Sequence, residues 1–179
     1  MRSVRIFALV AGLTVVASLQ ASAQTMRTRH GFWANLGVAG GSLGCQNCDT
    51  RENGLSGAFA VGGALSQKVM LGVSSNAWTK SENGASLNVG AVTAMVRFYP
   101  SSKGNFFLVG GLGMGSISTK LTGFGRETET GGAAMLGLGY DLRLARNFSL
   151  TPFWNVVGVT TDNNNDANFG QLGLGFTIH

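Results

Sequence analysis

The amino-acid sequence predicts an all-β fold, an eight-stranded antiparallel up-and-down transmembrane β-barrel. Eight short stretches alternate bulky apolar residues with Gly, Ala, Ser, Asn or Thr, which is the two-residue period of a strand with two different faces. A segment typical of protein export precedes these stretches. Most charged residues lie between the stretches, so neither face of the predicted strands has the charge expected of a wall in water.

The N-terminal segment is predicted to be a signal peptide. Two arginines lie close to the start, Ile6–Ala17 is apolar, and Ala21-Ser22-Ala23 is a small-residue cleavage site. A retained membrane anchor is disfavoured, because the apolar stretch is shorter than the ~20 residues that a spanning helix needs. The predicted parts of the chain are a signal peptide over 1–23, an N-terminal tail over 24–30 and the barrel over 31–179.

Each predicted strand has about the ~9–11 residues that a tilted strand needs to cross the hydrocarbon of a membrane. The alternation is clearest in the last strand, where Leu172, Leu174, Phe176 and Ile178 alternate with glycine and polar residues. The strands are predicted, in chain order, at Phe32–Leu43, Leu55–Leu65, Val69–Trp78, Leu87–Tyr99, Phe106–Ile117, Gly132–Arg143, Phe148–Val159 and Phe169–Ile178. Equivalent one-faced sets in earlier strands are Phe32/Ala34/Leu36/Val38, Phe59/Val61/Gly63/Leu65, Val69/Leu71/Val73, Phe106/Leu108/Leu112/Met114 and Leu136/Leu138/Tyr140/Leu142.

The fourth predicted strand has the weakest pattern. Leu87 and Val89 lie on one parity, whereas Val92, Val96 and other apolar residues lie on the opposite parity. A β-bulge near Ala91 would place both sets on the same face, because one extra residue reverses the alternation.

The connections between the predicted strands alternate in length. Outer-membrane barrels have short periplasmic turns and longer outer loops, so both termini are expected in the periplasm. The short connections are Ser66–Lys68, Pro100–Asn105 and Leu144–Asn147. The longer connections are Gly44–Asn53, Thr79–Ser86, Ser118–Gly131 and Thr160–Asn168.

The charge distribution favours lipid on the bulky face and a compact lumen on the small-residue face. The only charged residues inside the predicted strands are Arg97, Asp141 and Arg143. A soluble barrel, the alternative, would need a charged exterior. Eight strands enclose a space about wide enough for side chains to fill. The expected lumen residues include Trp33, Asn35, Met70, Ser74, Asn76, Phe107, Met135, Phe153 and Asn155.

Aromatic residues lie near both ends of the predicted strands. Aromatic side chains favour the interface between membrane and water, so they are expected to form two rings around the barrel. Ordinary strand propensity is the simpler explanation of the same pattern. The expected periplasmic ring contains Phe32, Tyr99, Phe106, Tyr140, Phe148 and Phe176, and the outer ring contains Trp78 and Phe169.

The chain resembles the small eight-stranded outer-membrane barrels of the OmpA/OmpX type over about Gly31 to His179. The resemblance is carried by the opening Gly-Phe-Trp-Ala-Asn-Leu-Gly, the Arg-Phe-Tyr-Pro turn at 97–100, the Gly-Tyr-Asp-Leu-Arg stretch at 139–143 and the alternating last strand. It covers the barrel only, without a peptidoglycan-binding domain. The resemblance implies a bacterial outer-membrane location but not one function, since related barrels serve as structural proteins, adhesins, narrow pores and lipid-modifying enzymes.

Cys45 and Cys48 form a CxxC pair in the first predicted outer loop. An exported protein can keep such a pair oxidised, so a small disulfide that staples the loop is expected. A thioredoxin-like redox site would need a strand-to-helix context, and a zinc site would need two more ligands.

Arg97, Asp141 and Arg143 are all predicted near the periplasmic end of the barrel. A carboxylate between two guanidinium groups would form charge-assisted hydrogen bonds, so the three residues are expected to form a polar network in the lumen. The network could fill the barrel end as a structural element, or it could constrict a narrow water path.

The predicted function is that of a monomeric, non-enzymatic outer-membrane barrel with a structural or surface-interaction role; the alternative is a narrow pore or carrier for small solutes. His30 and His179 lack the spacing to a Ser and a carboxylate that would suggest a catalytic triad, and no cofactor is expected. The net charge of +5 comes from scattered basic residues, which disfavours nucleic-acid binding. The expected partners are outer-membrane lipid, lipopolysaccharide and an extracellular ligand bound through the outer loops.

Overall fold

The computed structural model describes residues 29–45, 50–82, 85–121, 125–161 and 166–179. These residues form one antiparallel sheet of nine strand segments in the order β6-β5-β4-β3-β2-β1-β9-β8-β7, and a further pairing of β6 with β8 completes a ring in which the first and last strands, β1 and β9, are neighbours. The segments are β1 (Gly31–Cys45), β2 (Glu52–Ala64), β3 (Val69–Glu82), β4 (Ala85–Phe98), β5 (Phe106–Leu121), β6 (Gly125–Tyr140), β7 (Leu142–Ala145), β8 (Phe148–Thr161) and β9 (Asp166–Ile178).

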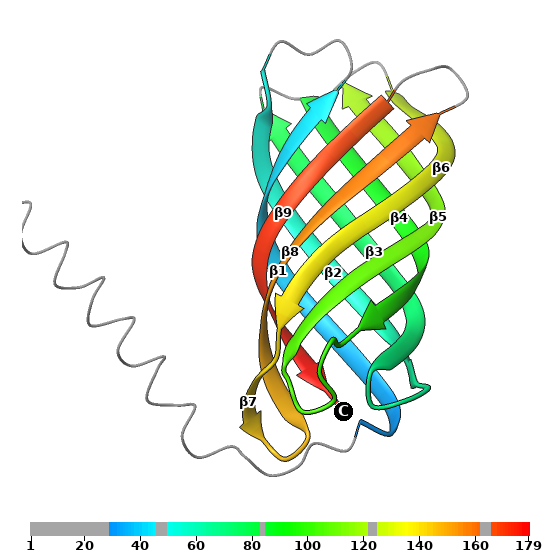
Figure 1. The fold of residues 1–179 in the computed structure, drawn as a ribbon. Coiled ribbons are helices and arrows are strands. Elements are labelled where there is room, and N and C mark those ends of the chain that lie inside the picture. Colours follow the sequence, from blue (N-terminus) through cyan, green and yellow to red (C-terminus); the bar gives the residue numbers. More distant parts are fainter. Residues whose placement is uncertain (1–28, 46–49, 83–84, 122–124, 162–165) are drawn as a thin grey trace, which may run out of the picture.

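The nine segments make eight positions in the barrel wall, because β6 and β7 occupy one position and are separated only by Asp141 (Figure 1). Strands that follow one another in the chain pair antiparallel, except that β6 and β7 both pair with β8, and β1 also pairs with β9, from Ala34↔Ile178 to Cys45↔Ala167. The predicted eight-stranded up-and-down barrel is therefore confirmed. No helix in the described part of the chain is long and apolar enough to cross a membrane.

One end of the barrel carries the C-terminus, the described start of the chain, and the β2–β3, β4–β5 and β7–β8 turns (Figure 1). We refer to this end as the terminal end and to the opposite end as the distal end. The predicted long connections at the distal end were largely wrong, because most of their residues extend the strands. The clearest case is the pairing of β5 with β6, which continues from Ile117↔Glu129 to Leu121↔Gly125.

Pairs of polar side chains on neighbouring strands explain these extensions. Side chains that face each other across an antiparallel pair stabilise it, even beyond the apolar part of the wall. The hydroxyl groups of Ser118 and Thr128 lie 2.9 Å apart, and those of Ser81 and Ser86 lie 2.8 Å apart. Sequence alternation missed these segments because both of their faces are polar.

The predicted bulge near Ala91 is absent. The register of β4 runs without a break along β3, from Val69↔Phe98 to Glu82↔Ala85, and it is equally continuous along β5. The apolar residues change parity because the lumen is apolar at the distal end, where Val89 is 1% exposed. The structure instead has a register shift in β7, between Arg143 and Ala145.

The outer wall carries large apolar side chains that are exposed to the surroundings. Leu112, for example, is 73% exposed, and similar residues occur on every long strand. Soluble monomers rarely expose continuous apolar patches larger than a few hundred Å². This wall is therefore suited to acyl chains. Members of the wall include Phe32, Leu36, Val38, Leu55, Phe59, Leu71, Val73, Val92, Leu108, Leu112, Met114, Leu136, Trp154, Leu172 and Leu174.

The opposite face of the strands fills the lumen. All nine residues that the sequence places there are buried, namely Trp33, Asn35, Met70, Ser74, Asn76, Phe107, Met135, Phe153 and Asn155. The prediction of two aromatic rings was partly wrong, because Trp78, Tyr99 and Phe169 are at most 1% exposed. Each of these three residues has the inward parity of its strand, and this alternation outweighs the preference of an aromatic side chain for the interface.

Trp78 fills the distal lumen over two glycines. A Cβ atom at Gly41 would lie 2.5 Å from Trp78 Cδ1, and a Cβ at Gly54 would lie 2.7 Å from Trp78 Cε2. Leu43, Val89, Val159 and Phe169 belong to the same buried apolar cluster. The glycines thus provide the space that a large ring needs inside a small barrel.

We expect Gly41→Leu to destabilise the barrel by about 1–3 kcal/mol, because the new side chain would displace the Trp78 indole from a packed lumen. Gly40→Leu is the matched control, since Gly40 points outward and a Cβ atom added there would have no heavy atom within 4 Å. The control should change stability by less than about 0.5 kcal/mol. Urea unfolding of both variants in detergent measures the difference, and equal stabilities would contradict this packing.

Candidate functional site

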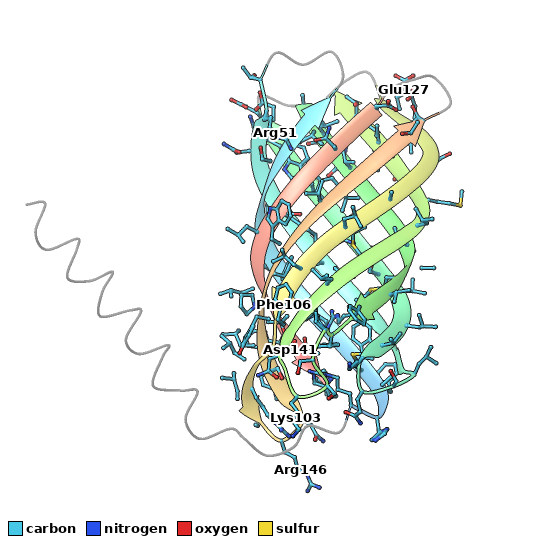
Figure 2. The ribbon with its side chains drawn as sticks, viewed as in Figure 1. Arg51, Lys103, Phe106, Glu127, Asp141 and Arg146 are labelled. Carbon is cyan, nitrogen blue, oxygen red and sulfur yellow. The ribbon has the colours of Figure 1, made fainter. Side chains whose placement is uncertain are left out.

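Asp141 is the centre of a polar network in the terminal half of the lumen (Figure 2). It lies between β6 and β7, where its backbone N–H donates to Asn105 O at 3.0 Å, and its side chain is fully buried. The Tyr99 hydroxyl donates to Asp141 Oδ2 at 2.8 Å, and Thr151 Oγ1 donates to Oδ1 at 2.9 Å. His179 Nε2 lies 4.0 Å from Oδ2. Both carboxylate oxygens therefore have partners despite their burial.

A relay of hydrogen bonds extends from Asp141 across the lumen. Because the Thr151 hydroxyl donates to the carboxylate, the Thr177 hydroxyl at 2.7 Å is the donor to Thr151. Asn35 Nδ2 in turn donates to Thr177 Oγ1 at 2.8 Å. The relay joins β1, β9, β8 and Asp141, so it ties together the strands on both sides of the β1–β9 closure.

Arg97 and Arg143 have different surroundings. The Arg97 guanidinium is buried and lies 4.4 Å from the Trp33 ring and 4.2 Å from the Phe107 ring, so its contacts are aromatic rather than with the carboxylate. Arg143 donates to the carbonyls of Ala145 and Arg146, at 3.2 and 2.6 Å, and stabilises the β7–β8 turn. The shared network of Arg97, Asp141 and Arg143 stays a prediction.

Arg29 closes the terminal end, a role that the sequence pattern did not reveal. Its guanidinium lies 3.6 Å from the Tyr99 ring centre and donates to the carbonyls of Gln67, Ser102 and Gly104. The Arg29 side chain is 1% exposed. The available signal was parity, because position 29 has the same parity as the buried Trp33 and Asn35 of β1.

A second polar network crosses the lumen nearer the distal end. Ser56 Oγ donates to Gln171 Oε1 at 2.5 Å, and Gln171 Nε2 donates to Asn76 Oδ1 at 2.6 Å. Asn76 Nδ2 lies 3.4 Å from Ser74 Oγ, whose hydroxyl lies 2.8 Å from Thr93 Oγ1. All five side chains are buried. Satisfied networks of this kind make a buried polar lumen compatible with a stable fold.

The distal rim carries an ion-pair cluster beyond the apolar wall. Lys80 Nζ lies 2.6 Å from Glu52 Oε2 and 2.9 Å from Glu82 Oε2. The hydrogen bonds that Lys80 donates to Glu52 and Glu82 raise the pKa of Lys80, and the bond from Lys80 lowers the pKa of Glu82. The lysine charge at this rim is therefore already paired with carboxylates.

An open groove lies on the barrel surface beside Arg51, which Figure 2 places at the distal end. Arg51 donates to Ser42 Oγ at 3.1 Å, to Ser42 O at 2.6 Å and to Asn168 Oδ1 at 2.9 Å. The groove has a volume of about 560 Å³. Its residues include Gly40, Ser42, Arg51, Trp154, Gly170 and Leu172.

The histidines and cysteines add no catalytic arrangement to the described residues. His30 Nε2 lies 3.1 Å from Gln67 Nε2, and the His179 backbone N–H donates to Asn147 O. Across the described ranges, no group of three or more His, Cys, Asp or Glu side chains could hold a metal ion. Cys45 ends β1, but Cys48 lies outside the described residues, so the Cys45–Cys48 disulfide stays a prediction. The predicted signal peptide also lies outside them.

A closed antiparallel barrel with an apolar outer wall and a packed polar lumen defines the class of transmembrane β-barrels. The chain belongs to the outer membrane protein beta-barrel domain family, whose model matches residues 11–179. It is a bacterial outer-membrane protein, and the predicted resemblance to small eight-stranded barrels is confirmed.

Two solved structures illustrate the similarity. The fold is similar to Ail, the attachment invasion locus protein of Yersinia pestis, with a TM-score of 0.62 and 17% identity over 83% of this chain and 99% of Ail. It is also similar to Neisserial surface protein A, with a TM-score of 0.64 and 14% identity over 82% of this chain and 96% of that protein. At sequence identities this low, the similarity supports a shared fold and nothing more. A search of curated proteins found no match.

We expect Tyr99→Phe to destabilise the barrel by about 1.5–3 kcal/mol, because it removes a donor to the buried Asp141 carboxylate. Tyr140→Phe is the matched control, since Tyr140 has the outward parity of β6 and the same hydroxyl is removed. The control should change stability by less than about 0.5 kcal/mol. Urea unfolding in detergent compares the two, and an equal loss would contradict the role given to the Tyr99 hydroxyl.

Proposed function

We propose that this protein is a monomeric, non-enzymatic outer-membrane barrel whose lumen is a structural core and whose distal rim interacts with molecules at the cell surface. The observation that carries the proposal is the packing of the lumen at both ends. Tyr99, Asp141 and Arg29 are at most 1% exposed at the terminal end, and Trp78 and Phe169 are at most 1% exposed at the distal end. Side chains along a water-filled path would have accessible surface.

The same packing argues against the alternative of a narrow pore or carrier. A solute would have to displace the Arg29 guanidinium from three backbone carbonyls and then cross two hydrogen-bonded networks. At the distal end it would meet the Trp78 indole, which is packed against Gly41 and Gly54. The Asp141 network therefore fits a structural role better than a gate.

Short turns at the terminal end support a periplasmic position for this end and an external position for the distal rim. We likewise propose that residues 1–23 are a signal peptide and that residues 24–30 form an N-terminal tail before the barrel. Lipopolysaccharide is the partner that best suits the groove near Arg51, because a guanidinium can bind its phosphates while the bare wall over Gly40 and Gly170 accepts an acyl chain. Ail has been solved in complex with the heparin analogue sucrose octasulfate, which illustrates an anionic ligand on a barrel of similar fold.

We expect the refolded protein to give no stepwise conductance in planar lipid bilayers, because the lumen offers no continuous water path. Asp141→Ala should also stay silent if the network is structural, since Tyr99, Trp33 and Arg29 remain in the terminal lumen. Stable, regular conductance steps from the wild-type protein would contradict the proposal and favour the pore. Steps that appear only in Asp141→Ala would identify Asp141 as a gate.

We expect Arg51→Ala to weaken lipopolysaccharide binding by about tenfold, the loss of one charge-assisted hydrogen bond. Arg146→Ala is the matched control, because Arg146 is an exposed arginine in the β7–β8 turn at the opposite end (Figure 2). Native mass spectrometry of both variants in detergent with purified lipopolysaccharide gives the two affinities. Equal affinities would exclude the groove as the binding site without affecting the conductance result.

A further inference from the structure

A small cavity lies inside the barrel between the two polar networks. Its volume is about 30 Å³, and a cavity needs roughly 10–15 Å³ to hold one water molecule. Asn35 and Thr151 from the terminal network and Ser74 and Asn76 from the distal network are among its residues. The cavity therefore has room for a particle a little larger than water, but not for a polyatomic solute such as phosphate or a sugar.

The Arg97 guanidinium forms part of the cavity wall and has unused hydrogen-bond donors. The ring centres of Trp33 and Phe107 lie 4.4 and 4.2 Å from its central carbon, so both rings make cation–π contacts with the guanidinium. Its Nε and Nη1 atoms are buried and have no hydrogen-bond partner among the described residues. The Arg97 side chain is only 4% exposed. Donors of this kind are costly to leave unpaired in a barrel interior.

The buried charges of the described chain do not balance. They are two guanidinium groups, on Arg29 and Arg97, and one carboxylate, on Asp141. Arg29 donates to backbone carbonyls, and Asp141 accepts from Tyr99 and Thr151. Arg97 is left with aromatic rings, which attract a cation through their quadrupoles but do not neutralise it.

The remaining wall of the cavity suits an anion. None of its residues is acidic, and Asn155 contributes a side-chain amide with two N–H donors. Met95, Met135 and Phe153 provide apolar, polarisable surface. Size excludes larger anions, and desolvation in such a wall disfavours multivalent ones.

We propose that Arg97 and this cavity form a binding site for one small monovalent anion of halide size, with chloride as the ligand in the cell. The anion accepts hydrogen bonds from the Arg97 guanidinium edge and neutralises the second buried guanidinium. The site has a structural role: the bound anion completes the lumen between the two networks. It requires neither a conducting lumen nor lipopolysaccharide binding at Arg51.

The direct test is crystallography of the wild-type protein refolded and crystallised in sodium bromide, with data collected at the bromine absorption edge. We expect an anomalous peak within hydrogen-bond distance of Arg97 Nε or Nη1. Density for water alone at this position, in crystals that show bromide elsewhere, would overturn the proposal.

Thermal unfolding in detergent provides the matched measurement in solution. At equal ionic strength, the wild-type protein should unfold at a higher temperature in chloride or bromide than in gluconate, an anion too large for the cavity, because a ligand of the native state stabilises it. Arg146→Met should keep this difference and Arg97→Met should lose it. An equal difference in both variants would show a general salt effect and overturn the proposal. If Arg97→Met does not fold, the anomalous density of the wild-type protein decides the question.

Discussion

Closure of the backbone between β1 and β9 is the constraint on which the rest of this structure depends. In hydrocarbon, each unpaired peptide group costs several kcal/mol, so an open sheet edge is not tolerated. The twelve paired positions from Ala34↔Ile178 to Cys45↔Ala167 remove both edges of the sheet at once. Closure then fixes which residue of every strand faces lipid and which faces the lumen, because the side chains alternate strictly along a paired strand.

The lumen follows from this alternation and divides into three levels. The terminal end holds charged and hydroxyl groups around Asp141 and Arg29, the middle holds amides and hydroxyls around Gln171, and the distal end holds apolar side chains around Trp78. Polar side chains are tolerated in the first two levels because they bind one another. Arg97 lies between the terminal and middle levels, where its guanidinium contacts two aromatic rings. The small adjoining cavity therefore matters for the charge balance of the barrel.

Alternation in the sequence was sufficient to predict the closed barrel, its eight wall positions and the nine lumen residues, because a two-residue period reports directly on a wall with two different faces. The alternation led to wrong predictions where the lipid face and the lumen face of a strand carry similar residues. The polar extensions of β5 and β6 were mistaken for a loop, and the apolar distal lumen around Val89 was mistaken for a bulge. The aromatic positions failed for another reason: parity, not interfacial preference, decided the direction of Trp78, Tyr99 and Phe169. The partners of Asp141 could not be predicted, since Tyr99 and Thr151 converge only through the register of distant strands.

The central claim is that the apolar wall requires lipid while the backbone closes upon itself. Circular dichroism and heat-modifiable gel migration of the urea-unfolded chain, diluted into buffer with or without phospholipid vesicles, test this claim most directly. The structure predicts a β-strand spectrum and a shifted migration of the unheated sample only when vesicles are present. A folded, monomeric, water-soluble protein in the vesicle-free sample would contradict it.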